Sequence, residues 1–182
     1  MKGIIFNLAE EVVSAEHGDL AWDAVLDGAG VSGSYTSLGS YPDADLMAIV
    51  ASAATLLGTD QQAVLRHVAE GAIPLLAQRY PHFFTPHLDA LSFVLTLNDM
   101  IHPEVRKLYP GAEPPVFAYD VTGENAVTLT YESPRTLCAL AEGFLVGAAA
   151  HYGQRVTIDR TACRLRGAEQ CLLHCEFSDA AA

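Results

Sequence analysis

Apolar residues recur at intervals of three and four through roughly the first hundred residues, and this period predicts helices. Two stretches show the repeat most clearly: Leu46, Ile49, Val50, Ala53, Leu56 and Leu57, and Val64, Leu65, Val68, Ala72, Leu75 and Leu76. Asp60 stands in the N-cap position of the second helix, and Pro74 is expected to bend that helix. The first part of the chain is therefore predicted to be helical.

A third helical stretch leads to a histidine. Its inward-facing positions follow one another at spacings of three and four: Leu88, Leu91, Leu95, Asn98 and His102. Proline disfavours helical geometry in the residue before it, so Pro103 is expected to end or kink this helix at His102. The sequence thus predicts a buried imidazole at a mechanically weak point.

After Pro110 the pattern changes to alternation, which is typical of strands. The predicted elements are a hairpin of residues 116–121 and 126–131, a helix over 135–152, and strands over 154–163 and 170–177. The predicted fold class is α+β, with one domain over 1–178. Its helical lobe covers about 1–110, and a lobe over about 111–178 holds a four-stranded antiparallel sheet and a helix. Residues 179–182 are expected to form a tail.

Charge and composition argue against some classes of function. The chain has 182 residues, is 51% hydrophobic and carries a formal net charge of -12, which argues against binding nucleic acid or anionic lipid. Neither a secretory signal nor a membrane-spanning stretch is recognisable, so a cytoplasmic location is expected. All four cysteines follow residue 137, a placement that favours thiolate or metal chemistry over a secreted disulfide framework.

Tyr131, Ser133 and Arg135 occupy alternate positions, so in an extended strand they line one face. Phenol, hydroxyl and guanidinium groups suit a pair of carboxylates such as haem propionates, and His102 supplies a candidate axial ligand. Each element has a simpler interpretation: a lone histidine on an apolar helix face is more often a core residue, and a polar strand end is ordinary.

Several motifs in order resemble those of the haem nitric oxide and oxygen binding (H-NOX) family, which includes the haem domain of soluble guanylate cyclase. They are the opening Met-Lys-Gly-Ile-Ile-Phe-Asn-Leu, Ile101-His102 followed by Glu104-Val105, Gly111-Ala112-Glu113-Pro114-Pro115, and Tyr131-x-Ser133-x-Arg135. The resemblance extends essentially from Met1 to Phe177. It implies a haem sensor rather than an enzyme, with the haem buried between the two lobes.

The same resemblance implies specific roles. His102 would be the proximal ligand of the iron of haem b, and Tyr131, Ser133 and Arg135 would clamp the propionates. Ile5 and Pro115 would press on the macrocycle and hold it out of plane. Pro103 is not part of the family motif.

The ligand preference is inferred from the distal side. Family members that hold oxygen resemble one another in having a tyrosine at the position of Leu140, and the other expected distal positions fall at Ala9 and Pro74. None of these three side chains donates a hydrogen bond, whereas bound dioxygen needs a donor. We therefore expect selective binding of nitric oxide, with carbon monoxide as a laboratory ligand. By resemblance to bacterial members, the partner would be a sensor histidine kinase or a cyclic-di-GMP enzyme.

The cysteines allow a second function. Cys163 and Cys171 flank Gly167 and should be cross-strand neighbours, with Cys175 on the same face as Cys171 and Cys138 on the helix that covers it. Such thiols suit zinc, but Cys171 and Cys175 also fit an ordinary buried strand face. In family members with a zinc site a histidine ligand stands where Arg160 stands here, so either Cys175 completes the set or the site is absent. The alternative function is a zinc and thiol redox sensor in which haem is secondary. A haem enzyme such as a peroxidase ranks last, because the distal side lacks an acid-base pair.

Overall fold

The computed structural model describes residues 1–180 and has an α+β fold, as predicted. Its α-helices are α1 (Gly3–His17), α2 (Asp19–Ala29), α3 (Asp43–Leu57), α4 (Gln61–Arg79), α5 (Pro81–Phe84), α6 (Ala90–Leu95), α7 (His102–Leu108) and α8 (Cys138–His151). The strands are β1 (Val116–Gly123), β2 (Ala126–Glu132), β3 (Gln154–Ala162) and β4 (Cys171–Asp179). A π-helix, η1 (Leu97–Ile101), and a 3-10 turn, η2 (Arg164–Arg166), complete the elements.

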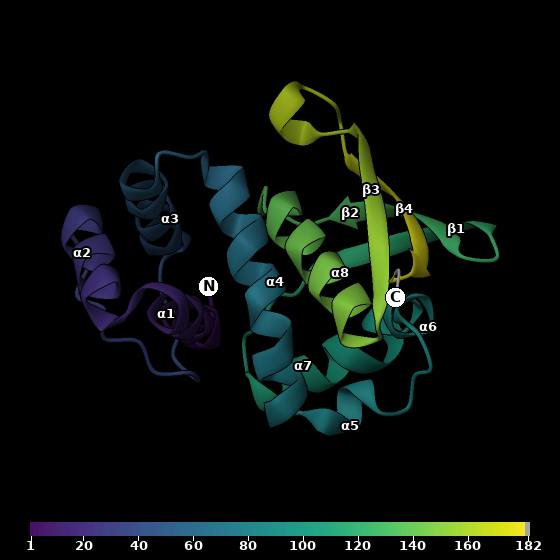
Figure 1. Ribbon diagram of the computed structural model, residues 1–182, viewed down its shortest axis with the longest axis horizontal. Coiled ribbons are helices and arrows are strands. Elements are labelled where there is room, and N and C mark those ends of the chain that lie inside the picture. The colour runs from purple at the N-terminus through teal and green to yellow at the C-terminus, as the bar shows by residue number, and fades with distance from the viewer. Residues whose placement is uncertain (181–182) are drawn as a thin grey trace.

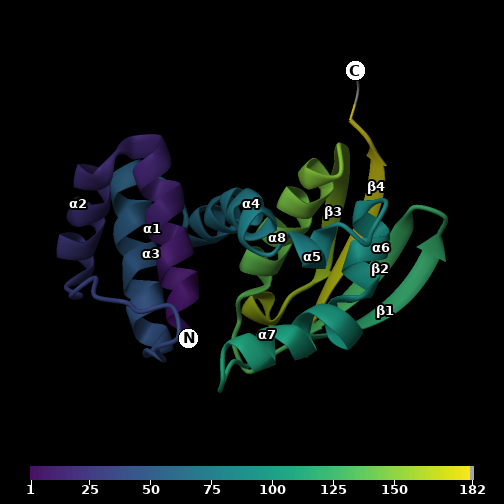
Figure 2. The same cartoon turned by 90° about the horizontal axis from the view of Figure 1, so that it is seen from below.

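The elements form two groups with a pair of helices between them (Figure 1). Helices α1, α2 and α3 lie together at one end, and the sheet lies at the other (Figure 2). The sheet is antiparallel with strand order β1-β2-β4-β3, so the predicted hairpin of β1 and β2 is confirmed. Helices α4 and α8 run side by side between the groups in both views.

Two glycines allow α8 to approach α4 closely. A Cβ on Gly143 would lie 2.1 Å from the carbonyl oxygen of Arg66, and one on Gly147 would lie 2.7 Å from that of Glu70. Side chains at these positions would therefore force the two helices apart. This close packing places α8 between α4 and the sheet, which explains why its apolar residues do not follow a single face.

The hydrophobic core divides inside α4 rather than near residue 110, where the lobe boundary was predicted. Val64 and Leu65 of α4 pack with α1, α2 and α3, whereas Ile73 of the same helix packs with α5, α6 and the sheet. Helical periodicity reports that a helix has a buried face, but it does not identify the partner of that face. The capping role of Asp60 is confirmed, since its Oδ1 accepts from the N–H of Ala63 at 2.9 Å. Pro74 lies inside α4, which continues to Arg79.

The segment before His102 differs from the predicted single helix. Asp89 and Ser92 form a capping box that starts α6, so Leu88 lies outside the helix and is 95% exposed. Placing Leu88 on the buried face was therefore wrong. The predicted helix is interrupted by the π-helix η1, which ends directly before His102. Helix α7 then begins at His102 itself. Pro103 falls in the first turn of α7, where the absence of an N–H breaks no helical hydrogen bond.

Some predicted boundaries move. The helix expected from residue 135 begins at Cys138, and β4 extends to Asp179, which shortens the predicted tail. Residues 181–182 of that tail lie outside the described part of the chain. In residues 1–180 no helix combines the length and the apolar character needed to cross a membrane.

Candidate functional site

A cavity of about 450 Å³ lies between α1, α4, α7, α8 and the start of β1, with mostly apolar walls. All seven residues that the sequence assigned to cofactor binding line it: Ile5, His102, Pro115, Tyr131, Ser133, Arg135 and Leu140. Ala9 instead lines a separate small cavity of about 20 Å³, and Pro74 lines neither of the two. The volume falls within the range of cofactor pockets, which is roughly 300–1000 Å³.

His102 lines this cavity, and one nitrogen of its imidazole has no hydrogen-bond partner in the described part of the chain. Its Nδ1 is buried and has no hydrogen-bond partner among residues 1–180. Burial and the charge of Arg106 lower the pKa of His102 to about 4, and the carbonyl of Pro115 opposes the shift. The ring is therefore uncharged at neutral pH and keeps a lone pair for a metal ion. A core histidine would be hydrogen-bonded, so the simpler interpretation of this residue explains it less well.

A tight turn brings Tyr131, Ser133 and Arg135 together at the end of β2. The strand ends at Glu132, so the prediction that all three alternate along one strand was wrong for the last two. The hydroxyl of Tyr131 donates to the carbonyl of Arg135 at 3.2 Å, and the N–H of Arg135 donates to Oγ of Ser133 at 3.1 Å. These bonds fold the turn so that the three side chains still line the same cavity.

The guanidinium of Arg135 binds two acidic residues that the sequence did not point to. Its Nε donates to Oδ2 of Asp43 at 2.7 Å and its Nη2 donates to Oε2 of Glu113 at 3.1 Å. Asp43 also accepts from the amino group of Met1 at 2.6 Å. Although burial raises the pKa of Asp43, the bonds from Met1 and Arg135 outweigh it and lower that pKa. The geometry of Arg135 thus suits ligands with carboxylate groups.

Two tyrosines that the sequence did not suggest also line the cavity. The hydroxyls of Tyr80 and Tyr109 lie 2.5 Å apart and bond to each other. They follow α4 and α7, and burial together with this bond raises the pKa of Tyr109. No local pattern could have paired them, because the two residues come from the ends of different helices.

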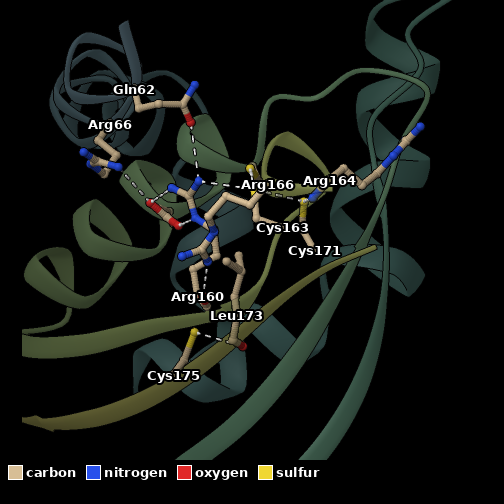
Figure 3. A network of polar contacts seen from close by, with 11 residues as sticks. Gln62, Arg66, Arg160, Cys163, Arg164, Arg166, Cys171, Leu173 and Cys175 are labelled. Carbon is tan, nitrogen blue, oxygen red and sulfur yellow. Dashed lines mark hydrogen bonds and ion pairs between the residues drawn. The ribbon is translucent and has the colours of Figure 1, made fainter. Parts of the chain in front are cut away.

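Three of the four cysteines form a cluster, and Figure 3 shows two of them, Cys163 and Cys171. The Sγ atoms of Cys138, Cys163 and Cys171 all lie within 4.8 Å of one another, with 3.8 Å between Cys138 and Cys163 and 3.9 Å between Cys171 and Cys163. Cys175 is not part of the cluster, because its thiol contacts the carbonyl of Leu173 at 3.7 Å. Of the two alternatives drawn from the sequence, the one in which Cys175 completes a four-cysteine set does not agree with this arrangement.

Arg160 occupies the remaining side of this cluster (Figure 3). It forms an ion pair with the buried carboxylate of Glu142, with 2.7 Å between Nη2 and Oε2, and its Nη1 lies 3.6 Å from Sγ of Cys163. Arg66 also bonds Glu142, at 3.2 Å. Burial raises the pKa of Cys163, but the hydrogen bond from Arg160 and the neighbouring donors bring it down to about 7. Burial raises the pKa of Cys138 to about 12.

Comparison with known proteins gives one consistent result. A family model described as Haem-NO-binding matches residues 2–160. An H-NOX protein from S. oneidensis in the Fe(II)NO ligation state is 35% identical, with 98% of this chain and 100% of that chain covered and a TM-score of 0.90.

Two further solved structures are less similar. The Fe(II) unliganded H-NOX protein from K. algicida is 23% identical over 100% of this chain and 99% of its own, with a TM-score of 0.87. An oxygen-binding H-NOX domain related to soluble guanylate cyclases, in its oxygen complex, is 19% identical over 98% and 96%, with a TM-score of 0.80. No curated protein sequence matches the chain.

Proposed function

Because the chain belongs to the Haem-NO-binding (H-NOX) family, whose domains bind haem and sense gases, we propose that it is a nitric oxide sensor that regulates a separate signalling protein. This proposal rests on one observation above all. The unpaired imidazole of His102 and the turn of Tyr131, Ser133 and Arg135 line the same apolar cavity. That combination matches a planar macrocycle with an iron ligand on one side and two acidic groups at its edge.

The residues of the cavity fit haem b. His102 would hold the iron through its neutral ring, and Arg135, Ser133 and Tyr131 would bind the propionates. Ile5 in α1 and Pro115, directly before β1, would both contact the macrocycle. When bound, the haem would supply an iron atom with an open position for a diatomic gas.

Selectivity for nitric oxide follows from the character of α8. Leu140 is the residue of α8 that stands at the expected distal position, and it offers no hydrogen-bond donor to stabilise the charge of bound dioxygen. The hydroxyls of Tyr80 and Tyr109 are paired with each other. The S. oneidensis relative has been solved in its Fe(II)NO and Fe(II)CO ligation states, which supports binding of these two gases.

The signal would begin at His102. Binding of nitric oxide would loosen the hold of His102 on the iron, and α7, which begins at this residue, would then be free to shift. The change would pass to a partner, for which a sensor histidine kinase or a cyclic-di-GMP enzyme is proposed. The test is an absorption spectrum of the purified ferrous protein, first in air and then with nitric oxide. We expect no change in air and a new spectrum with nitric oxide; stable oxygen binding or turnover of peroxide would overturn the proposal.

Loss of the arginine of the clamp should weaken haem retention. For Arg135→Leu we expect haem to dissociate about tenfold faster or more, because a charge-assisted hydrogen bond contributes about 1.5–3 kcal/mol. The measurement is the rate of haem transfer to a high-affinity acceptor protein. Arg164→Leu is the matched control: Arg164 bonds the carbonyl of Ser133 in the same turn but does not line the cavity. Equal rates for the two variants would contradict the role of Arg135.

The cysteine cluster bears on the alternative of a zinc site. In a zinc tetrahedron with Zn–S bonds of about 2.3 Å, sulfur atoms lie about 3.8 Å apart, and the three thiols approach this spacing. The cation of Arg160, however, stands beside Cys163 where a fourth ligand would be needed. We therefore infer that Arg160, rather than zinc, neutralises the cluster.

Substitution of Arg160 by histidine should turn the cluster into a zinc site, because it replaces a cation with a ligand. We expect Arg160→His to carry about one zinc per chain and the native protein to carry far less. Elemental analysis after dialysis against a chelator measures this. Arg155→His, on an exposed position of the same strand, is the control. Stoichiometric zinc in the native protein would refute the inference.

A further inference from the structure

The side chain of Asn98 pairs with the backbone of an edge strand. In the sheet, β1 has a neighbour on one side only, so its outer edge presents backbone groups that need partners. The amide of Asn98 supplies a donor and an acceptor for this edge. Its Nδ2 donates to the carbonyl of Phe117 at 2.6 Å, and its Oδ1 accepts from the N–H of Phe117 at 3.1 Å. One side chain thus takes the place of a neighbouring strand at Phe117.

Asn98 belongs to the π-helix that leads directly to His102. In η1 the N–H of His102 bonds to the carbonyl of Leu97, and that of Ile101 bonds to the carbonyl of Thr96 at 3.2 Å, each across five residues. A single turn of this kind is rare and is frequently found at functional sites. Whatever fixes this turn also fixes the start of α7 and therefore the imidazole.

The bonds of Asn98 are an isolated polar link. Apart from the contact of the His102 ring with the carbonyl of Pro115, Asn98 alone among residues 97–108 forms a side-chain hydrogen bond to a different part of the structure described by residues 1–180; the ion pair of Glu104 with Lys107 stays within α7. The ring of His102 forms none through its Nδ1. The remaining restraint on the segment is apolar packing, such as the 6.1 Å approach of the His102 and Phe117 rings.

We propose that Asn98 is a positioning residue that holds the turn carrying His102 against β1 and thereby opposes the release of His102 from the haem iron. This inference rests on the proposed function, in which His102 is the iron ligand. Phe117 connects the two halves of the site: it contacts His102 on one side, and its ring meets that of Tyr131 edge to face at 5.9 Å on the other. The amide of Asn98 therefore sets the distance from the imidazole to the clamp.

Asn98→Ala is the test. In the ferrous haem protein we expect a weaker and broader iron–histidine vibration in the resonance Raman spectrum. With nitric oxide we expect the equilibrium constant for release of His102 to rise about tenfold, since two hydrogen bonds are lost. Asn98→Gln keeps the amide and should fall between Asn98→Ala and the native protein. Asn125→Ala removes the same side chain at the far end of the hairpin, where it is exposed, and should leave both readouts unchanged.

The outcomes separate the two proposals. If Asn98→Ala lowers the melting temperature but leaves the vibration and the release of His102 as in the native protein, Asn98 is merely structural and the inference is wrong. If the native protein shows no iron–histidine vibration that disappears in His102→Gly, the proposed function itself fails. A shifted vibration in Asn98→Ala, with Asn125→Ala unchanged, supports the positioning role.

Discussion

Replacing His102 with glycine is expected to abolish the iron–histidine vibration of the ferrous protein while the fold survives. Among residues 1–180, His102 is the one histidine that lines the cavity. Its removal should cost little stability, about 1 kcal/mol, because the half-buried ring has no hydrogen bond at Nδ1 to lose. Resonance Raman spectroscopy measures the first effect, and thermal unfolding followed by circular dichroism measures the second. Added imidazole should restore the vibration, since it can occupy the space that the side chain leaves.

His87→Gly is the matched control for this experiment. His87 lies in the segment before α6 and bonds the hydroxyl of Thr96 at 3.3 Å, but it does not line the cavity. Its substitution should leave the ferrous spectrum as in the native protein. An unchanged spectrum in His102→Gly, or an equal change in both variants, would show that His102 is not the ligand.

Much of the fold was predictable because periodicity and turn residues act locally. The alternation after Pro110 predicted the hairpin and the antiparallel sheet, and Asp60 predicted the start of α4. The errors came from contacts between distant segments or from caps that were overlooked. Leu88 matched the helical spacing, yet the capping box of Asp89 and Ser92 starts the helix after it. The division of the core inside α4 depends on which elements pack together, and no single segment encodes that.

The site was predictable to the same extent: local motifs pointed to its residues, whereas contacts between distant segments left no signal in the sequence. The resemblance to the H-NOX family selected seven residues, all of which line the cavity, but it did not reveal what holds them in place. Asp43 lies 92 residues before Arg135, so their ion pair had no local signal. Cys175 was assigned to the cluster because it shares a strand face with Cys171. Residues four apart along a strand are separated by about 13 Å, however, and that is too far for one metal ion.

Replacing Leu140 with tyrosine is expected to convert the protein from one that excludes oxygen into one that holds it. Iron-bound dioxygen carries negative charge on its outer atom, and a phenol on α8 would donate a hydrogen bond to it inside an apolar cavity. A hydrogen bond to a charged group contributes about 1.5–3 kcal/mol, which corresponds to an increase in oxygen affinity of about 10- to 150-fold. Absorption spectra of the ferrous protein over a range of oxygen pressures measure this directly.

Leu140→Phe separates the hydrogen bond from the change in shape, because it adds the same ring without the hydroxyl. Leu140 lines both the large cavity and the small one beside α1, so an aromatic ring fills similar space in either variant. We expect Leu140→Phe to bind oxygen as weakly as the native protein does. If both variants gain affinity equally, cavity shape rather than polarity controls the choice of gas. If neither gains any, the distal pocket lies elsewhere than at Leu140, and the paired hydroxyls of Tyr80 and Tyr109 become the groups to substitute next.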